Sequence, residues 1–332
     1  MGGQYDTVST TKNTDQTKNK EDKEMLKAQR FGVEIEMTGI KRAKAAQIVA
    51  KVLGSRVSGP SHGCYKTRVI PDSTGRKWQI MRDSSIHPIK NDGDVSASSD
   101  LYKVEMVTPI LKYEDIELLQ TIVRELRSAG AKTNSSCGIH IHVDGANHNA
   151  DSLKRLVNFI VERQDIIYEA LDISSSRANR WCRKLNDNIL KEMKADRNLT
   201  TSEAERIWYS PANDGYRNGI DHQHYNTTRY HGINLHSFFS KGTVEFRLFN
   251  STLHAGKIKA YIQFCLAVSA WAITSKKKVV FHSMENYTPE QKVTIMRNIL
   301  TRRLGLSGDE FKTCRLHLMT PLKKRAGMTT AA

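Results

Sequence analysis

Four short segments of the chain alternate apolar and polar residues, which is the pattern of a strand with one buried face. They are residues 31–36, 102–108, 137–142 and 243–247. In a strand, residues i and i+2 point to the same face, about 6–7 Å apart. We therefore predict four strands that each bury apolar side chains on one side of a sheet and present polar side chains on the other.

Helical spacing of apolar residues appears between these strands. It predicts helices at residues 43–53, 113–128, 152–171, 257–274 and 289–304, with Gly54 as a C-cap and Asp151 as an N-cap. Further strands are predicted at residues 78–83 and 230–238, the second joined to the strand at 243–249 by a hairpin at 240–242. This order predicts an α+β fold, with helices packed on one face of a mostly antiparallel sheet.

The chain divides by composition into three regions. Residues 1–28 are polar and predict a disordered tail. Residues 29–275 predict a single catalytic domain, because the polar strand residues run from Glu34 to Arg247. The looser pattern of residues 174–228 within it indicates a helical and loop insertion that serves as a lid over the site. Residues 276–332 predict a basic, helical C-terminal extension.

A net charge of +16 favours anionic binding partners. The basic residues are dispersed, with only two short runs at 276–278 and 323–325 and no interleaved aromatic residues. We therefore expect nucleotide phosphates or carboxylates rather than nucleic acid. No apolar run is long enough to span a membrane, and the five cysteines form no CxxC pair. These features favour a cytoplasmic location.

The polar positions of the strands are rich in metal-binding side chains. Each strand offers one or two such side chains on a single face: Glu34 and Glu36, then Glu105, then His140 and His142, then Glu245 and Arg247. Crowded carboxylates repel one another and raise each other's pKa unless a cation neutralises them. The pattern therefore indicates a site for divalent metal ions on the polar face of the sheet.

The order of these motifs resembles the amidoligase family of carboxylate–amine ligases, distant relatives of glutamine synthetase and glutamate–cysteine ligase. The matching motifs are Glu-x-Glu at 34–36, the glutamate before Val-Thr-Pro at 107–109, Gly-x-His-x-His at 138–142, Asn234, and Glu-Phe-Arg at 245–247. They extend over residues 30–275, and five such motifs in one order are more specific than any of them alone. The resemblance implies a glutamine-synthetase-like curved sheet with the active site on the face opposite the helices.

The resemblance also implies a reaction. A substrate carboxylate would attack the γ-phosphate of ATP to give an acyl phosphate, and an amine would then displace phosphate to form an amide. The implied partners are small-molecule or peptide carboxylates and amines, with Mg²⁺, or Mn²⁺, as the metal. Only one glutamate stands in the second acidic strand, where glutamine synthetase has two nearby, so the implied amine is larger than ammonia.

Roles for individual residues follow from the same resemblance. One metal would be held by Glu34, His140 and Glu245, and another by Glu36 and Glu105. Arg247 would contact the γ-phosphate or the acyl phosphate, as a forked guanidinium suits phosphate oxygens. His142, Arg229 and Asn234 would line the nucleotide or substrate pocket.

Several alternatives remain open at this level. The same residues could serve a metal-dependent hydrolase or nuclease, and a non-catalytic binding protein could retain a degenerate ligase fold. Glu34 and Glu36 could be the solvent face of an edge strand, and Glu245 with Arg247 a surface ion pair. His140 and His142 could form half of a zinc site with Cys137.

Overall fold

The computed structural model describes residues 20–90, 99–196, 198–213, 221–223, 225–276 and 287–329. Most of the predicted polar tail and most of the basic run at 276–278 therefore lie outside the described residues. Residues 20–28, which we assigned to that tail, form a helix in which Leu26 is 1% exposed. This helix packs on the core through Leu26. Just beyond the helix, Gln29 Nε2 donates a hydrogen bond of 2.8 Å to the Leu266 carbonyl.

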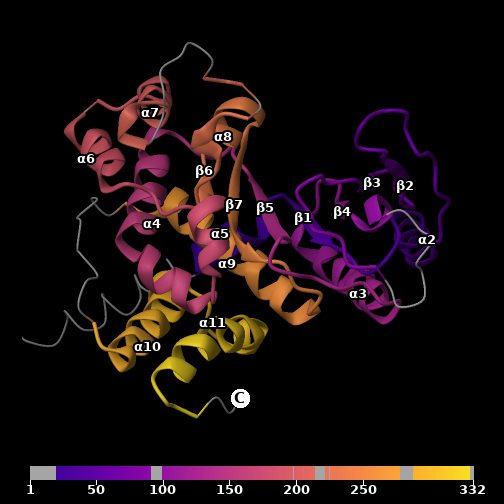
Figure 1. Cartoon of the computed structure of the whole chain (residues 1–332). Helices are drawn as coiled ribbons and strands as arrows, with labels where there is room; N and C mark the ends of the chain where they lie inside the picture. Colours follow the sequence, from indigo (N-terminus) through magenta and orange to yellow (C-terminus); the bar gives the residue numbers. More distant parts are fainter. Residues whose placement is uncertain are drawn as a thin grey trace, which may run out of the picture.

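Seven described strands form one curved sheet in the order β2-β3-β4-β1-β5-β7-β6 (Figure 1). Every neighbouring pair is antiparallel. The strands are β1 (Phe31–Met37), β2 (Arg68–Pro71), β3 (Lys77–Met81), β4 (Val104–Val107), β5 (Gly138–Asp144), β6 (Ile233–Asn234) and β7 (Thr243–Asn250). The predicted α+β class and the antiparallel sheet are confirmed, and β1 lies at the centre of the sheet.

Ten further α-helices accompany the sheet in the described residues. They are α2 (Arg42–Leu53), α3 (Ile116–Ser128), α4 (Ala150–Ala170), α5 (Ser175–Arg180), α6 (Asp187–Ala195), α7 (Thr201–Trp208), α8 (His236–Lys241), α9 (Ala255–Thr274), α10 (Pro289–Asn298) and α11 (Lys312–Arg325). Helix α2 packs on β2 and β3, and α9 packs on β5, while α3, α4 and α11 pack on α9 (Figure 1). Val33 and Ile35 of β1 are 1% and 0% exposed within this core, so the alternate residues of β1 point to the other face.

Two predicted helix ends have different outcomes. Gly54 ends α2 in the left-handed conformation with φ 60°, as predicted. The predicted cap at Asp151 is wrong, because the Asn149 side chain accepts the Ser152 backbone N–H at 2.9 Å and the helix begins at Ala150. Asn149 and Ser152 bond each other reciprocally, which the apolar spacing alone does not reveal.

The predicted hairpin at residues 230–249 is only partly correct. Strand β6 spans just Ile233–Asn234, and the chain then turns into helix α8 before β7. Asn234 Oδ1 accepts the Ser237 N–H at 3.4 Å, and Gly242 ends the helix with φ 73°. The adjacent pair Phe238 and Phe239 suits a helical turn, whereas a strand would place one of them on each face.

The insertion and the C-terminal extension are both helical and share the main core. Helices α6 and α7 bury Met193 and Trp208, each 0% exposed, and α6 packs on α4. Helices α10 and α11 contribute Met296 and Leu318 to the same apolar cluster. None of the helices in the described ranges is both long and apolar enough to cross a bilayer.

Candidate active site

The register of the sheet brings the predicted site residues together on its polar face. In the central strand, Glu34 lies opposite His140 of β5, and Glu36 lies opposite Glu105 of β4. A shift of one residue in β1 would move both carboxylates into the apolar core. The buried alternation of Val33 and Ile35 therefore fixes the position of both acids.

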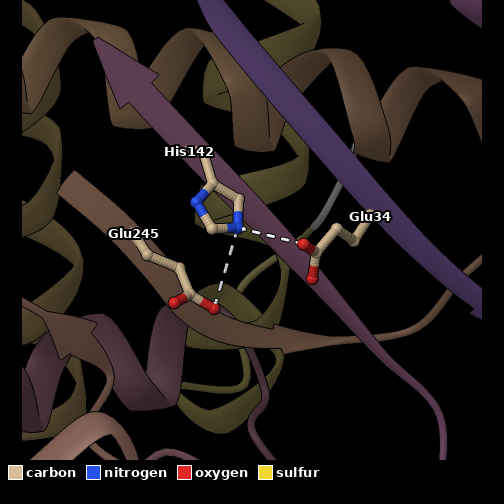
Figure 2. A group of neighbouring side chains, drawn as sticks. All are labelled: Glu34, His142 and Glu245. Carbon is tan, nitrogen blue, oxygen red and sulfur yellow. Dashed lines mark ion pairs between the residues drawn. The ribbon is translucent and has the colours of Figure 1, made fainter. Parts of the chain in front are cut away.

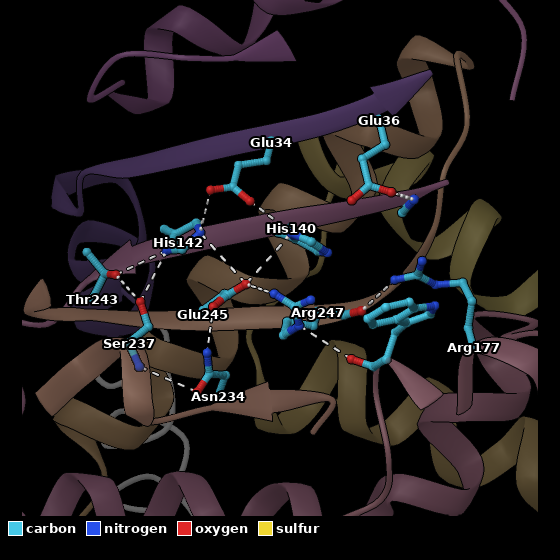
Figure 3. A network of polar contacts seen from close by, with 12 residues as sticks. Glu34, Glu36, His140, His142, Arg177, Asn234, Ser237, Thr243, Glu245 and Arg247 are labelled. Carbon is cyan, nitrogen blue, oxygen red and sulfur yellow. Dashed lines mark hydrogen bonds and ion pairs between the residues drawn. The ribbon is translucent and has the colours of Figure 1, made fainter. Parts of the chain in front are cut away.

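The same face continues across β5, β7 and β6. His142 lies opposite Glu245, and Glu245 lies opposite Asn234. Asn234 Nδ2 donates a hydrogen bond of 2.6 Å to Glu245 Oε2 (Figure 3). Asn234 is 1% exposed and lies behind the carboxylate, so the structure places it as a support for Glu245 rather than as a pocket residue.

Glu34 forms the centre of the cluster. Its Oε2 lies 2.9 Å from His140 Nδ1, and its Oε1 lies 3.3 Å from His142 Nε2. His142 Nε2 is also 3.9 Å from Glu245 Oε1 (Figure 2), and His140 Nδ1 is 3.8 Å from the same oxygen. Glu34, His140 and Glu245, which the sequence suggested as ligands of one metal, therefore meet at one point, and His142 joins them there.

The arrangement of donor atoms suits divalent cations. Three groups of side chains each place their ligand atoms within 4.8 Å of one another: Glu34, His142 and Glu245; Glu34, Glu105 and His140; and Glu36, Asp83 and Glu105. Carboxylate oxygens and imidazole nitrogens are the donors that Mg²⁺ and Mn²⁺ accept. Because Glu34 and Glu105 each belong to two groups, the three positions are neighbours.

His142 has the geometry of a metal ligand. Its Nδ1 is 3.1 Å from Thr243 Oγ1, which fixes the ring. Its Nε2 is buried and points at two carboxylates, with Glu34 Oε1 at 3.3 Å and Glu245 Oε1 at 3.9 Å. A ligating histidine is commonly oriented in this way through its second nitrogen. The structure therefore groups His142 with the candidate metal ligands, where the sequence assigned it to a pocket wall.

The zinc half-site with Cys137 is not supported by the structure. Cys137 Sγ is buried and lies 3.5 Å from Asn134 Oδ1, and none of the candidate metal groups in the described chain includes it. Glu36 is 5% exposed and sits on the central strand, so the edge-strand interpretation is wrong as well.

Burial raises the pKa of two carboxyl groups of the cluster when no cation is present. Burial, reinforced by the charge of Asp83, raises the pKa of Glu36 to about 8, although Arg177 and Arg247 oppose the shift. Burial and the charges of Glu34 and Glu36 raise the pKa of Glu105 well above its usual range. A bound cation would favour the ionised forms of both groups.

Two other carboxylates stay ionised. Burial acts to raise the pKa of Glu34, but the charge of His142 and hydrogen bonds from both histidines hold it well below its usual value. Burial is likewise outweighed at Glu245, where Arg247 and the two histidines lower the pKa to about 2. The pKa values of the carboxyl groups are therefore lowered in the half of the site around Glu34 and Glu245 and raised in the half around Glu36 and Glu105.

A pocket of about 390 Å³ opens onto the cluster. Four acids line it, Glu34, Glu36, Glu105 and Asp83, and three arginines line it as well, Arg177, Arg229 and Arg247. Trp181, Tyr225 and Tyr230 complete this wall, with the Arg229 guanidinium 5.7 Å from the Tyr225 ring centroid. Arg247 is 5% exposed, so it belongs to the site and is not part of a surface ion pair.

A second pocket of about 380 Å³ lies on the other side of Glu34. Its lining includes Phe31, Gly32, Pro109 and Ile110, and His142 faces it. Glu34, Val107 and Lys241 line both pockets. His142 and Arg229, which the sequence assigned to one pocket, therefore lie in different pockets that meet at the cluster.

Two residues of the first pocket received no assigned role from the sequence. Asp83 follows β3, two residues after Met81, and Met81 lies opposite Glu105. That spacing places Asp83 beside Glu105, but the signal requires knowledge of the β3–β4 pairing. Arg177 comes from α5, and its position next to β5 follows only from the tertiary structure.

Residues 27–269 match the model of a family described as "Putative amidoligase enzyme". The chain belongs to this family. Enzymes of this family are ligases that join a carboxylate to an amine. The matched residues include every side chain of the cluster around Glu34. A comparison with curated proteins found no significant match.

One solved structure resembles this amidoligase-family chain. It is a bifunctional glutathione synthetase from Pasteurella multocida, at 12% identity and a TM-score of 0.43. The alignment covers 94% of this chain and 51% of that protein, so the chain spans about half the length of the synthetase.

Proposed function

We propose that this chain is an ATP-dependent carboxylate–amine ligase that works through an acyl phosphate. The observation that supports it is the row of Glu, His and Arg side chains on one sheet face, with three neighbouring groups of metal ligands beside Arg247. Phosphoryl transfer depends mainly on positioning and on neutralising charge, and this row supplies both.

The proposed reaction has two steps. A carboxylate oxygen of the first substrate attacks the γ-phosphorus of ATP, and the bond to the bridging oxygen breaks to release ADP. The amine, after loss of its proton, then attacks the acyl carbon, and inorganic phosphate leaves with the electrons of the acyl–oxygen bond. The products are an amide, ADP, phosphate and a proton.

The residues of the chain have separate tasks in this scheme. Glu34, Glu245, His140 and His142 would hold one or two metal ions, and Glu36, Glu105 and Asp83 would hold another. Bound Mg²⁺ or Mn²⁺ would neutralise the phosphate charge and align the attacking and leaving oxygens. Arg247 would donate N–H groups to the transferring phosphoryl group.

The two pockets suit the two sides of the reaction. The second pocket has an apolar lining of Phe31, Pro109 and Ile110, which suits an adenine ring, and it ends at Glu34 and Lys241. A nucleotide bound there would bring its terminal phosphate to the metal ligands. The first pocket, with its acids and arginines, would hold the carboxylate and the amine. Its small volume favours small-molecule or peptide substrates over nucleic acid.

The acyl phosphate provides the test. With ATP, Mg²⁺ and pooled amino acids or dipeptides, we expect ADP formation that requires a carboxylate substrate, and we expect hydroxylamine to trap a hydroxamate. Glu36→Gln should abolish both signals, whereas Glu114→Gln, at an exposed position outside the site, should retain them. ADP formation without any acceptor would favour a hydrolase instead, and metal-dependent cleavage of nucleic acid would favour a nuclease. Absence of nucleotide and metal binding would favour a non-catalytic protein.

A further inference from the structure

Arg177 is a buried cation that forms no ion pair within the described chain, although its charge acts on the nearby Glu36. It is 2% exposed, and no described carboxylate lies within 4.0 Å of its guanidinium as an ion pair. Its Nη2 donates to the Arg247 carbonyl at 3.3 Å, and its Nε has no hydrogen-bond partner. A buried, unpaired guanidinium is costly, so the fold retains a group that an anion would satisfy.

The chain makes room for this guanidinium at Gly138. A Cβ atom on Gly138 would lie 2.5 Å from both Nη1 and Nη2 of Arg177 and 2.7 Å from its Cζ. Any other residue at 138 would therefore displace the guanidinium. Gly138 also donates its N–H to Glu36 Oε2 at 2.6 Å, so Arg177 sits beside one end of the acid row.

Figure 3 shows the order of the groups along the face. Thr243 and His142 lie at one end, Glu34, Glu245 and Arg247 in the middle, and Arg177 at the opposite end, beyond Arg247. The apolar pocket that suits a nucleotide contains Thr243 and His142, whereas Arg177 lines only the other pocket. Arg177 is therefore placed at the substrate end of the row rather than at its nucleotide end.

We propose that Arg177 binds a carboxylate of the acyl substrate other than the one that is phosphorylated, so that this substrate is a dicarboxylate. The proposal rests on the ligase function above. A planar guanidinium forms two parallel hydrogen bonds to a carboxylate, and burial strengthens them. Arg247, already paired with Glu245 at 2.6 Å, is left for the reacting end of the molecule.

Binding measurements without turnover test the assignment. Calorimetric titration with Mg²⁺ present would compare the affinities of glutarate and butyrate. Butyrate is one carbon shorter than glutarate and lacks the second carboxylate. We expect glutarate to bind at least about tenfold more tightly to the native protein, the size of one charged hydrogen-bonded contact. Arg177→Lys and Gly138→Ala should each reduce this preference to about threefold or less while leaving butyrate binding unchanged.

Matched controls separate this effect from a general loss of structure. Arg206→Lys changes an exposed arginine, and Gly63→Ala adds a Cβ where no atom lies within 4 Å. Both should keep the native preference, and all variants should show a cooperative thermal transition. If Gly138→Ala does not fold, Arg177→Lys alone decides the outcome.

Three results with the two acids would overturn the proposal, and a fourth concerns inorganic phosphate. They are equal binding of glutarate and butyrate to the native protein, an unchanged preference in Arg177→Lys, and no detectable binding of either acid. Inorganic phosphate that binds tightly and loses affinity in Arg177→Lys, in place of glutarate, would assign the site to a phosphoryl group and also overturn it. Because no step consumes ATP, a failure here is distinguishable from a failure of the ATP-dependent reaction.

Discussion

Arg247 Nη1 donates a hydrogen bond of 2.6 Å to Glu245 Oε1, and the two side chains lie two residues apart on one face of β7. Arg247 Nε also contacts the Trp181 carbonyl at 3.3 Å, and the guanidinium carbon lies 5.8 Å from the Tyr230 ring centroid. The guanidinium is therefore held in place before any substrate arrives. Such fixed donors stabilise developing charge without reorganisation at the moment of reaction.

Replacement of Arg247 should therefore affect the rate more than nucleotide affinity. We expect Arg247→Ala to lower kcat by about 10²–10³-fold, the usual loss for one such donor. Arg247→Lys should recover little of this, because lysine lacks the planar fork. Steady-state kinetics with a direct measurement of nucleotide Kd would check both. Normal turnover by the alanine variant would refute the role assigned to Arg247.

Loss of Arg247 has a second consequence that needs a control. The pKa of Glu245 is low because the arginine and two histidines outweigh its burial, so the alanine variant should protonate Glu245 more readily. A metal titration of Arg247→Ala at high pH, where Glu245 is ionised again, would show whether the rate loss persists at full metal occupancy. Persistence would assign the loss to the missing phosphate contact.

Metal binding should release protons. Burial and the charge of Asp83 raise the pKa of Glu36 to about 8, so this group is protonated at neutral pH without a metal. A cation held by Glu36 must displace that proton, and apparent affinity should rise by up to about tenfold per pH unit below pH 8 before it levels off. Calorimetry in buffers of different ionisation enthalpy measures the proton directly. Glu36→Gln should bind more weakly and lose this contribution to the pH dependence.

The same shift predicts how the stability of the metal-free protein depends on pH. The pKa of Glu36 is raised in the folded state from its ordinary value of 4.5 to about 8, so the unfolded state binds fewer protons between these values. The contribution of Glu36 to the free energy of unfolding is complete below pH 4.5. It is lost as the pH rises toward 8, by at most about 1.4 kcal/mol per pH unit. Urea unfolding of the native protein and Glu36→Gln would reveal the difference, and a native protein no more sensitive to pH than the variant would contradict it.

The central strands could be predicted from the sequence because apolar residues mark one of their faces and polar residues mark the other. In β1, Val33 and Ile35 alternate with Glu34 and Glu36, and this alternation fixes the face and the register together. The order of motifs then indicated which strands share the site. The pairing of Glu36 with Glu105 could not be read in advance, because strand order depends on contacts between distant segments.

Other parts of the structure depend on tertiary contacts that a single sequence does not display. Strand β2 (Arg68–Pro71) is four residues long and carries no alternation, so it was missed. In the sequence, Arg177 is one of several basic residues in a segment without clear apolar spacing. Its burial against Gly138 distinguishes it from its neighbour Arg180, which is exposed. Residues 236–238 of helix α8 were assigned to a strand, because a six-residue helix with two apolar residues is too short to show a helical period.

A substitution at Gly32 would selectively test the proposed nucleotide pocket. It precedes Glu34 by two residues on the same face, and a Cβ there would meet only Thr108 Oγ1, at 3.9 Å. Gly32→Val should therefore fold and fill part of the apolar pocket. We expect nucleotide Kd to rise at least about tenfold, with metal binding by Glu34 unchanged, as measured by calorimetry. Gly63→Ala is again the control, and unaltered nucleotide affinity in Gly32→Val would move the nucleotide to the other pocket.

The insertion at residues 174–228 should respond to ligands in only one of its parts. Arg177, Trp181 and Tyr225 line the first pocket, whereas α6 and α7 bury Leu190, Met193 and Trp208 against the core. Few apolar contacts and exposed backbone favour local opening, so the lid we predicted should be confined to the pocket-lining part.

Hydrogen exchange measured peptide by peptide would test this division. In the free protein we expect faster exchange in peptides over α5 and residues 225–230 than in α6 and α7. Addition of Mg²⁺ and a non-hydrolysable ATP analogue with glutarate should slow exchange in the first set and leave the second unchanged. Arg177→Lys should lose the part of this protection that glutarate adds, while the nucleotide alone should protect α5 little. Full protection of α5 and residues 225–230 in the free protein would show a fixed wall in place of a lid.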